Sequence, residues 1–282
     1  MFESNYVDVG EVRLHVVTAG PTTGIPVLFL HGWPDLWMSF EPQMAALAAD
    51  GWRVIAPDQR GYGLSDKPPA VSAYEVGRLS SDIVGLIDAL SIGPVHIVGH
   101  DWGGTVAWAL TAERPDLVRS LTAVNCPHPL ALSDAMLRPR QLLRAWYMLA
   151  FQIPWLPEAI LGARRAALQR SMLRFGAGVN EETLDRYQAS WAEPGAIGGP
   201  VNWYRATFRA AFRERARYRT WDRIAPPVQL IWGIREPVFT NRTLDDSIGL
   251  CRQAQVHRLG AGHWPHHDRP VEVTELLSTF MS

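Results

Sequence analysis

One short segment constrains what this chain can fold into: Gly99-His100-Asp101-Trp102-Gly103-Gly104. It follows the apolar run Val95–Val98, a predicted buried strand, and precedes a predicted helix over Thr105–Glu113. A turn this tight between strand and helix leaves no room for a Cβ at the glycines that flank its centre. The pattern therefore predicts a strand-turn-helix unit that holds the side chain of Asp101 at the carboxyl edge of a sheet.

Asp101 can be interpreted in two ways. Beside a helix N-terminus, the positive end of the helix dipole keeps a carboxylate ionised and available for reaction. Aspartate is also a common helix N-cap, which would make it purely structural. The other motifs of the chain favour the first interpretation.

Short apolar runs alternate with segments of helical periodicity over the first half of the chain. The predicted strands are Glu11–Val17, Val27–Leu30, Arg53–Ala56, Val95–Val98, Leu121–Val124, Val228–Trp232 and Gln255–Leu259. The predicted helices outside the central region are Leu36–Ala49, Tyr74–Leu90, Thr105–Glu113 and Pro270–Phe280. This order predicts an α/β fold with a mostly parallel sheet flanked by helices.

The alternation stops after about Pro129 and resumes near Thr220. The intervening sequence has helical patterns and loops but no convincing strand. We therefore expect a core formed by residues 1–129 and 220–282, with an all-helical cap, residues 130–219, inserted as a lid. Both outer parts are needed to complete the sheet.

Composition excludes several classes of protein. The chain has 282 residues, 47% of them hydrophobic, and a net charge of −1, which argues against disorder and against a nucleic-acid partner. Two cysteines exclude a disulfide framework and a thiolate metal site. No run of about 18 apolar residues is present, and we expect no signal peptide, no membrane partner and a cytoplasmic location. The 12 tryptophans indicate a large aromatic core or pocket.

Charge is divided unevenly along the chain. Residues 129–220 hold 14 arginines, no lysine and seven acidic residues. Four of the arginines, Arg205, Arg209, Arg213 and Arg217, have i,i+4 spacing. We interpret them as a solvated helix face, with a docking surface for an anionic partner as the alternative.

Five motifs in the right order resemble the α/β-hydrolase superfamily, in its aspartate-nucleophile branch of soluble epoxide hydrolases and haloalkane dehalogenases. They are His31-Gly-Trp-Pro34, Asp58-Gln-Arg-Gly-Tyr-Gly63, Gly99-His-Asp-Trp-Gly-Gly104, Asn125-Cys-Pro-His-Pro129 and Gly260-Ala-Gly-His-Trp264. The resemblance spans nearly the whole chain. It implies that Asp101 is a nucleophile that forms an ester with an alkyl carbon.

The resemblance also implies a base and an acid. His263, in the Gly-rich loop after the last strand, would activate the water that cleaves the ester. In the family an aspartate usually orients this histidine, and here Glu236 of Trp232-Gly-Ile-Arg-Glu-Pro237 stands at that place. Asp245, Asp246 and Asp268 are alternatives, and the other family position holds the uncharged Asn125. His266 and His267 are expected to point elsewhere.

An oxyanion formed during ester cleavage needs donors. The resemblance implies the backbone N–H groups of Trp33 and Trp102 for this role, and a cis bond between Trp33 and Pro34. It further implies two cap tyrosines, Tyr204 in Asn202-Trp-Tyr-Arg205 and Tyr147 in Trp146-Tyr-Met, which would donate protons to an epoxide oxygen.

These roles together predict an epoxide hydrolase that forms a vicinal diol and uses no cofactor and no metal. The predicted pocket residues are His31, Pro34, Trp102, Met148, Phe151 and Trp264. The partners would be a small-molecule epoxide and water, and the chain would be a monomer or homodimer. Haloalkane dehalogenation is the main alternative, and a non-catalytic ligand-binding protein is a weaker one.

Overall fold

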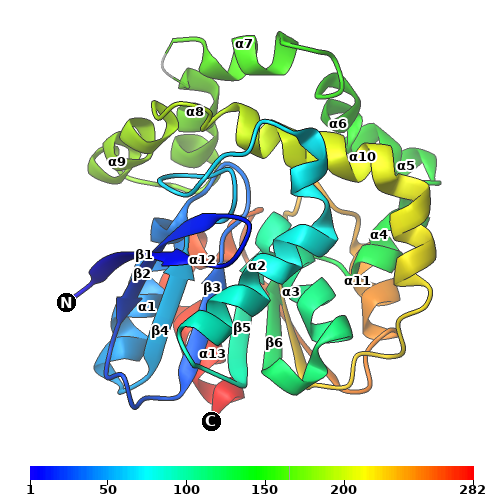
Figure 1. Ribbon diagram of the computed structural model, residues 1–282. Helices are drawn as coiled ribbons and strands as arrows, with labels where there is room; N and C mark the ends of the chain where they lie inside the picture. The colour runs from blue at the N-terminus through cyan, green and yellow to red at the C-terminus, as the bar shows by residue number, and fades with distance from the viewer. Residues whose placement is uncertain (165) are drawn as a thin grey trace.

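The computed structural model describes residues 1–164 and 166–282. An eight-stranded sheet occupies one half of the molecule, and a layer of helices covers one end of it (Figure 1). The strands are β1 (Glu3–Asp8), β2 (Arg13–Ala19), β3 (Pro26–Leu30), β4 (Arg53–Pro57), β5 (Val95–His100), β6 (Val118–Val124), β7 (Val228–Gly233) and β8 (Ala254–Leu259). Their order across the sheet is β1-β2-β4-β3-β5-β6-β7-β8.

The sheet is mostly parallel, as the alternation of strands and helices predicts. Strands β4, β3, β5, β6, β7 and β8 run parallel, whereas β1 and β2 pair antiparallel with each other and β2 pairs antiparallel with β4. Strand β1 was not predicted. Its sequence ESNYVD is exposed at five of six positions, so it lacks the alternating apolar pattern that marks a half-buried strand.

Helices cover both faces of the sheet. Those of the core are α1 (Glu41–Ala49), α2 (Val76–Ala89), α3 (Trp102–Glu113), α11 (Asn241–Ile248), α12 (Pro265–Asp268) and α13 (Pro270–Met281), with 3-10 turns at Trp37–Phe40, Val71–Tyr74 and Pro115–Leu117. On β3, Val27 and Phe29 pack with the residues of α1 and α13, and Leu28 and Leu30 pack with those of α2 and α3. Neighbouring apolar residues on one strand therefore fill two separate hydrophobic clusters.

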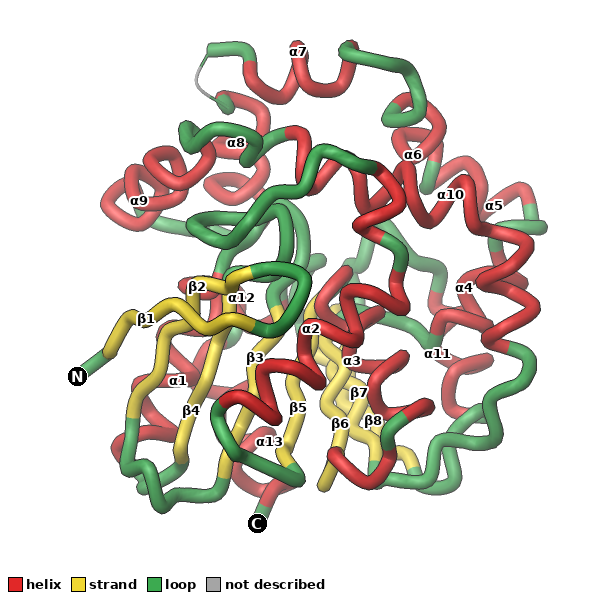
Figure 2. Tube along the Cα trace, viewed as in Figure 1, coloured by secondary structure: helices red, strands yellow, loops and turns green. Residues whose placement is uncertain are grey.

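The stretch between β6 and β7 is helical, and its described residues contain no strand. Its helices are α4 (Pro129–Ala135), α5 (Pro139–Arg144), α6 (Trp146–Ala150), α7 (Leu156–Gly162), α8 (Ala167–Gly176), α9 (Glu181–Trp191) and α10 (Gly198–Tyr218). In Figure 2 helices of this stretch form the red layer that lies above the yellow sheet. A division of the chain at residues 129 and 220 stays a prediction.

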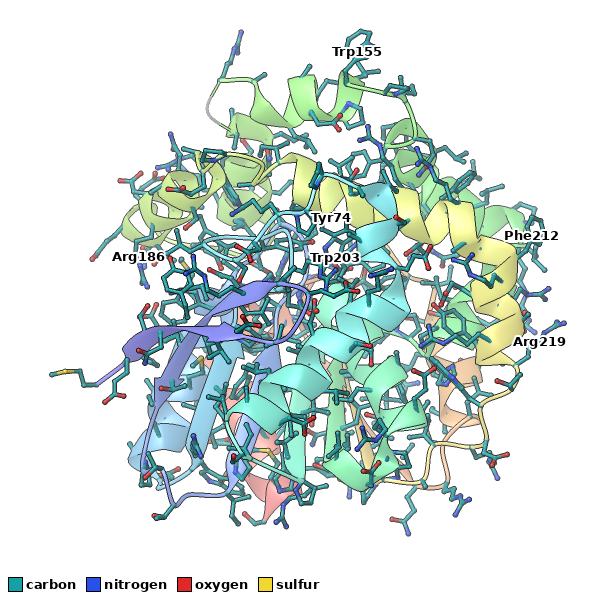
Figure 3. The ribbon with its side chains drawn as sticks, viewed as in Figure 1. Tyr74, Trp155, Arg186, Trp203, Phe212 and Arg219 are labelled. Atoms are coloured by element: carbon teal, nitrogen blue, oxygen red, sulfur yellow. The ribbon has the colours of Figure 1, made fainter. Side chains whose placement is uncertain are left out.

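Helix α10 connects this layer to the core. Trp203 is fully buried and its indole Nε1 donates to the Arg60 carbonyl at 2.9 Å, while Phe212, further along the same helix, is 94% exposed (Figure 3). The arginine stripe on α10 is solvated only in part, because Arg209 and Arg213 are exposed whereas Arg217 is partly buried. Arg205 is buried against Glu158, and Arg213 and Arg217 form ion pairs with acids of the core. Among the described residues, no helix is both long and apolar enough to cross a membrane.

Candidate active site

Asp101 lies at the turn between β5 and α3, in a backbone conformation that few L-residues adopt. Its φ is 49° and its ψ −118°. The glycines around it are required by close packing, because a Cβ on Gly99 would lie 2.6 Å from the Gly103 carbonyl oxygen. A Cβ on Gly103 would overlap the Leu30 carbonyl, and one on Gly104 would overlap the Cys126 side chain. The fold thus fixes Asp101 at the carboxyl end of the sheet, as predicted from the turn sequence.

The loop after β3 passes directly against this carboxylate. The Trp33 backbone N–H donates to Asp101 Oδ1 at 3.1 Å. A Cβ at Gly32 would lie 2.5 Å from the Asp101 Cβ, so only glycine permits this approach. The Trp33–Pro34 bond is cis, which confirms the expectation for this loop. Trp102 is the first residue of α3, where backbone N–H groups have no partner inside the helix.

His263 lies between two carboxylates. Its Nε2 is 3.6 Å from Asp101 Oδ2, and its Nδ1 is 2.6 Å from Glu236 Oε2. The imidazole is 5% exposed, so both contacts are shielded from water. The loop after β8 therefore brings His263 to the edge of the sheet where Asp101 and Glu236 also lie.

The turn after β7 holds Glu236 on its other oxygen. Backbone N–H groups of Val238 and Phe239 donate to Oε1 at 2.5 and 3.2 Å. Arg144 of α5 donates to the carbonyls of Glu236 and Phe239 at 3.1 and 2.6 Å. The two N–H groups and His263 therefore fix the carboxylate, and Arg144 fixes the backbone of the turn that carries it.

The acids considered as alternatives lie elsewhere. Asp268 accepts from the Gly262 N–H at 2.7 Å, while Asp245 pairs with Arg258 and Asp246 with Arg138. Asn125 donates to the Gly262 carbonyl and accepts from the Gly233 N–H, both at 2.7 Å. This side chain therefore links the end of β7 to the histidine loop.

The charges of the three groups depend on one another. Burial acts to raise the pKa of Asp101, but the adjacent His263 and the Trp33 N–H outweigh it and hold that pKa below its ordinary value. Burial acts to lower the pKa of His263, but the carboxylates of Glu236 and Asp101 outweigh it and raise the pKa to about 10. At neutral pH the site therefore holds an aspartate and an imidazolium.

Two tyrosines from helices between β6 and β7 line the same cavity as the carboxylate. Tyr204 on α10 is 3% exposed, and its ring lies edge-on to the Trp102 indole with 4.9 Å between centroids. The ring of Tyr147 on α6 is 5.9 Å from that of Tyr204. Burial, with the Asp101 charge as a further cause, raises the pKa of both hydroxyls, so both stay protonated and can donate.

These groups share one cavity of about 710 Å³. Its polar and aromatic wall contains Trp33, Asp101, Trp146, Tyr147, Phe151, Ser171, Phe175, Tyr204, His263 and Trp264. The rest of the wall is Ala150, Leu156, Pro157, Ile160, Leu161, Leu168, Met172, Gly176, Pro237 and Val238. Most of this wall is apolar and comes from α6, α7 and α8.

Of the six predicted pocket residues, the wall contains Phe151 and Trp264 but not His31, Pro34, Trp102 or Met148. The His31 ring is buried and bonds to the backbone of Gly32 and Gln59. The Pro34 carbonyl accepts from the Trp191 indole, which closes that side of the loop.

Trp102 and Met148 are displaced from the wall for reasons of packing. The Tyr204 ring stands edge-on to the Trp102 indole, which is 7% exposed. Met148 follows Tyr147 on α6, and successive helical residues point about 100° apart; Met148 is partly buried and packs against the hydrophobic core.

The wall residues of α7 and α8 were largely missed by the sequence analysis. Phe175 of α8, for example, was not predicted and is a wall residue that is 81% exposed. The sequence does contain one indication that Pro237 and Val238 line the cavity, because they directly follow Glu236 in the turn after a strand.

Comparison of the sequence with known proteins identifies its family and several relatives. The sequence matches the family described as alpha/beta hydrolase fold over residues 25–270. It is 34% identical to the AB hydrolase superfamily protein YfhM of Bacillus subtilis, covering 98% of this chain and 96% of that protein. It is 33% identical to Epoxide hydrolase A of Mycobacterium tuberculosis, covering 98% of this chain and 96% of that protein.

Solved structures give the same grouping. An epoxide hydrolase of Bacillus megaterium, in complex with an inhibitor, superposes with a TM-score of 0.89 at 29% identity, over 98% of this chain and 99% of that one. Epoxide Hydrolase A of Mycobacterium thermoresistibile superposes with a TM-score of 0.87 at 29% identity, over 99% of this chain and 98% of that one.

Proposed function

This chain belongs to the α/β-hydrolase family and has epoxide hydrolases among its full-length relatives, and on that premise we propose that it hydrolyses epoxides to vicinal diols through an ester on Asp101. One observation carries the proposal. A buried aspartate faces the same cavity as two protonated tyrosines and a histidine held by a second carboxylate. This set contains a nucleophile for carbon, donors for the leaving oxygen and a base for water.

In the first step Asp101 attacks a ring carbon of the epoxide. A C–O bond forms, the ring C–O bond breaks, and its electron pair goes to the epoxide oxygen. Tyr147 and Tyr204 donate to that oxygen, and one of them gives it a proton. Because the ring is opened by an anion, the low pKa of Asp101 keeps the nucleophile in its reactive form.

In the second step water cleaves the ester at the carboxyl carbon. Once the ester has removed the charge of Asp101, the His263 imidazolium gives up its proton, which replaces the one that the tyrosine gave to the epoxide oxygen. Its neutral Nε2 then takes a proton from the water, and Glu236 stabilises the imidazolium that results. The negative charge that develops on the former Asp101 oxygen is stabilised by the Trp33 N–H, which already donates to Oδ1. Collapse of this intermediate breaks the ester C–O bond, and the leaving alkoxide takes a proton from the His263 imidazolium to become the diol. The aspartic acid that is released gives its proton to His263 and becomes the aspartate again.

The size and the apolar wall of the cavity favour a hydrophobic substrate. Its volume falls in the range of small-molecule sites, and aliphatic and aromatic side chains form most of its wall. An aryl or alkyl epoxide would therefore bury its apolar part against α7 and α8 while its ring oxygen reaches the tyrosines. The cytoplasmic location and the monomeric or homodimeric state stay predictions.

The test is capture of the ester. With His263→Gln, a small aryl epoxide should produce an intact-mass increase equal to the whole epoxide, because the ester forms but is not hydrolysed. Asp101→Asn is the matched control and should give no adduct. An adduct from a haloalkane with loss of halide, and none from epoxides, would replace the proposal with dehalogenation. Ligand binding without turnover or adduct across an epoxide panel would indicate a non-catalytic protein.

A further inference from the structure

A second cluster of reactive side chains lies behind the active site, around the buried carboxylate of Asp35. His267 Nε2 is 3.5 Å from Asp35 Oδ1, and His266 Nε2 is 4.0 Å from Asp35 Oδ2. One atom from each of the three residues lies within 4.8 Å of the others. Asp35 and His266 are fully buried, and the His267 side chain is 11% exposed.

The imidazoles of this cluster lack hydrogen-bond partners within the described part of the chain. Both ring nitrogens of His266 and Nε2 of His267 are buried and unpartnered. A buried polar atom without a partner is destabilising, so such atoms in a folded protein are normally satisfied by something. His100 Nδ1 is buried and unpartnered as well, and it lies 3.7 Å from Asp35 Oδ2. Three unpartnered nitrogens, one from each histidine, thus lie within 4.0 Å of one carboxylate, which indicates a bound group that they share.

The groups that meet here are of the kinds that bind metals. Each of the three residues offers one ligand atom, an imidazole nitrogen or a carboxylate oxygen, and these atoms lie within 4.8 Å of one another.

Hydrogen bonds from two other side chains also orient the Asp35 carboxylate, as is usual for carboxylates that bind metals. The Tyr187 hydroxyl of α9 donates to Oδ1 at 3.1 Å, and the Trp264 indole donates to Oδ2 at 3.0 Å. Such outer hydrogen bonds fix the direction of a ligand's remaining lone pairs. Both oxygens fixed in this way also lie within 4.0 Å of the histidines of α12.

We propose that Asp35, His266 and His267 form a binding site for one divalent cation of the zinc class. Two imidazoles and one carboxylate suit Zn²⁺ and its first-row neighbours, whereas Mg²⁺ and Ca²⁺ prefer oxygen ligands throughout. The site has a structural role and takes no part in the chemistry of Asp101. It joins the loop that carries Trp33 to the helix that follows His263, and through Tyr187 it reaches the cap helices.

Metal binding to the full-length protein tests this proposal directly. After dialysis against a chelator, titration with Zn²⁺ followed by calorimetry should show one site per chain. Thermal unfolding should shift upward by roughly 5 °C at a hundredfold excess of free Zn²⁺ over its Kd. Loading with Co²⁺ should give a visible absorption band of a low-symmetry, four-coordinate site.

Two variants and one control test whether Zn²⁺ binds at this cluster. His267→Gln and His266→Gln should each weaken Zn²⁺ binding at least tenfold and remove the thermal shift. His96→Gln changes another buried histidine, which bonds to Ser120 at 2.7 Å outside the cluster, and should bind Zn²⁺ like the wild type. Lack of saturable Zn²⁺ binding to the wild type, or equal binding by wild type and both cluster variants, would overturn the proposal. Neither result depends on epoxide turnover.

Discussion

Replacing Glu236 by glutamine should separate the two chemical steps. Glu236 Oε1 accepts from the N–H groups of Val238 and Phe239, so the carbonyl oxygen of a glutamine will take that place. Its NH₂ group must then face His263 Nδ1, where a carboxylate oxygen now lies at 2.6 Å. An NH₂ group donates, so Nδ1 has to accept and the ring proton moves to Nε2. A histidine protonated on Nε2 cannot take a proton from water.

The magnitude follows from the loss of the correct tautomer. In hydrolytic triads the equivalent loss of charge and tautomer slows turnover by roughly 10⁴-fold. We therefore expect ester hydrolysis by Glu236→Gln to slow by roughly 10³–10⁴-fold, which corresponds to about 4–5.5 kcal/mol in activation free energy. Ester formation should fall far less, because Asp101 keeps the Trp33 N–H.

Rapid mixing with an aryl epoxide, followed by intact mass and diol measurement, checks this expectation. The adduct should form in a burst and then decay slowly. Glu236→Asp is the matched control: it keeps the charge but shortens the side chain by one methylene, so its hydrolysis rate should lie between those of wild type and Glu236→Gln. Turnover of a folded Glu236→Gln enzyme within tenfold of the wild-type rate, with no adduct, would refute the assignment of this carboxylate.

Three further results are expected. Tyr204→Phe should slow adduct formation about 100-fold, and the double change with Tyr147→Phe should abolish it, both measured with His263→Gln as the background. The pKa of His263 is raised from 6.5 to about 10, so the stability that its protonated form contributes is full below pH 6.5 and is lost as the pH rises to 10. Denaturant unfolding should therefore show the free energy of unfolding of the wild type falling between pH 6.5 and 10 relative to that of His263→Gln. Gly103→Ala should destabilise the fold by about 3 kcal/mol or more, whereas Gly162→Ala, whose Cβ meets nothing within 4 Å, should be neutral or slightly stabilising in the same unfolding assay.

Features fixed by local chain geometry could be predicted from the sequence. The turn around Asp101 needs glycines at set positions, and the structure has the strained backbone that they permit. Glu236 follows a strand end by a short turn, so its place beside His263 depends on few residues. The central strands were also predictable, because each one is a short apolar run with turn-forming residues at its ends.

Features that depend on packing between distant segments could not be predicted. The cavity wall from α7 and α8 depends on how amphipathic cap helices settle over the sheet, and their apolar residues fit either a core or a pocket. Arg205 looks solvated from its spacing, yet it is buried because Glu158 comes from a neighbouring helix. Asp35 and His266 are far apart in the chain, so no local pattern brings them together.

In the mechanism that we propose, the charge of Asp101 also controls the order of the two steps. In the free protein it helps to raise the pKa of His263 to about 10, so the histidine is protonated while the nucleophile is anionic. Ester formation removes that charge, and the pKa of His263 falls because burial then opposes Glu236 alone. The proton that leaves the imidazole balances the proton that Tyr147 or Tyr204 gives to the epoxide oxygen. His263 thus becomes a base only when an ester is present to be hydrolysed, and the aspartic acid released by hydrolysis returns its proton to the histidine and restores the starting state.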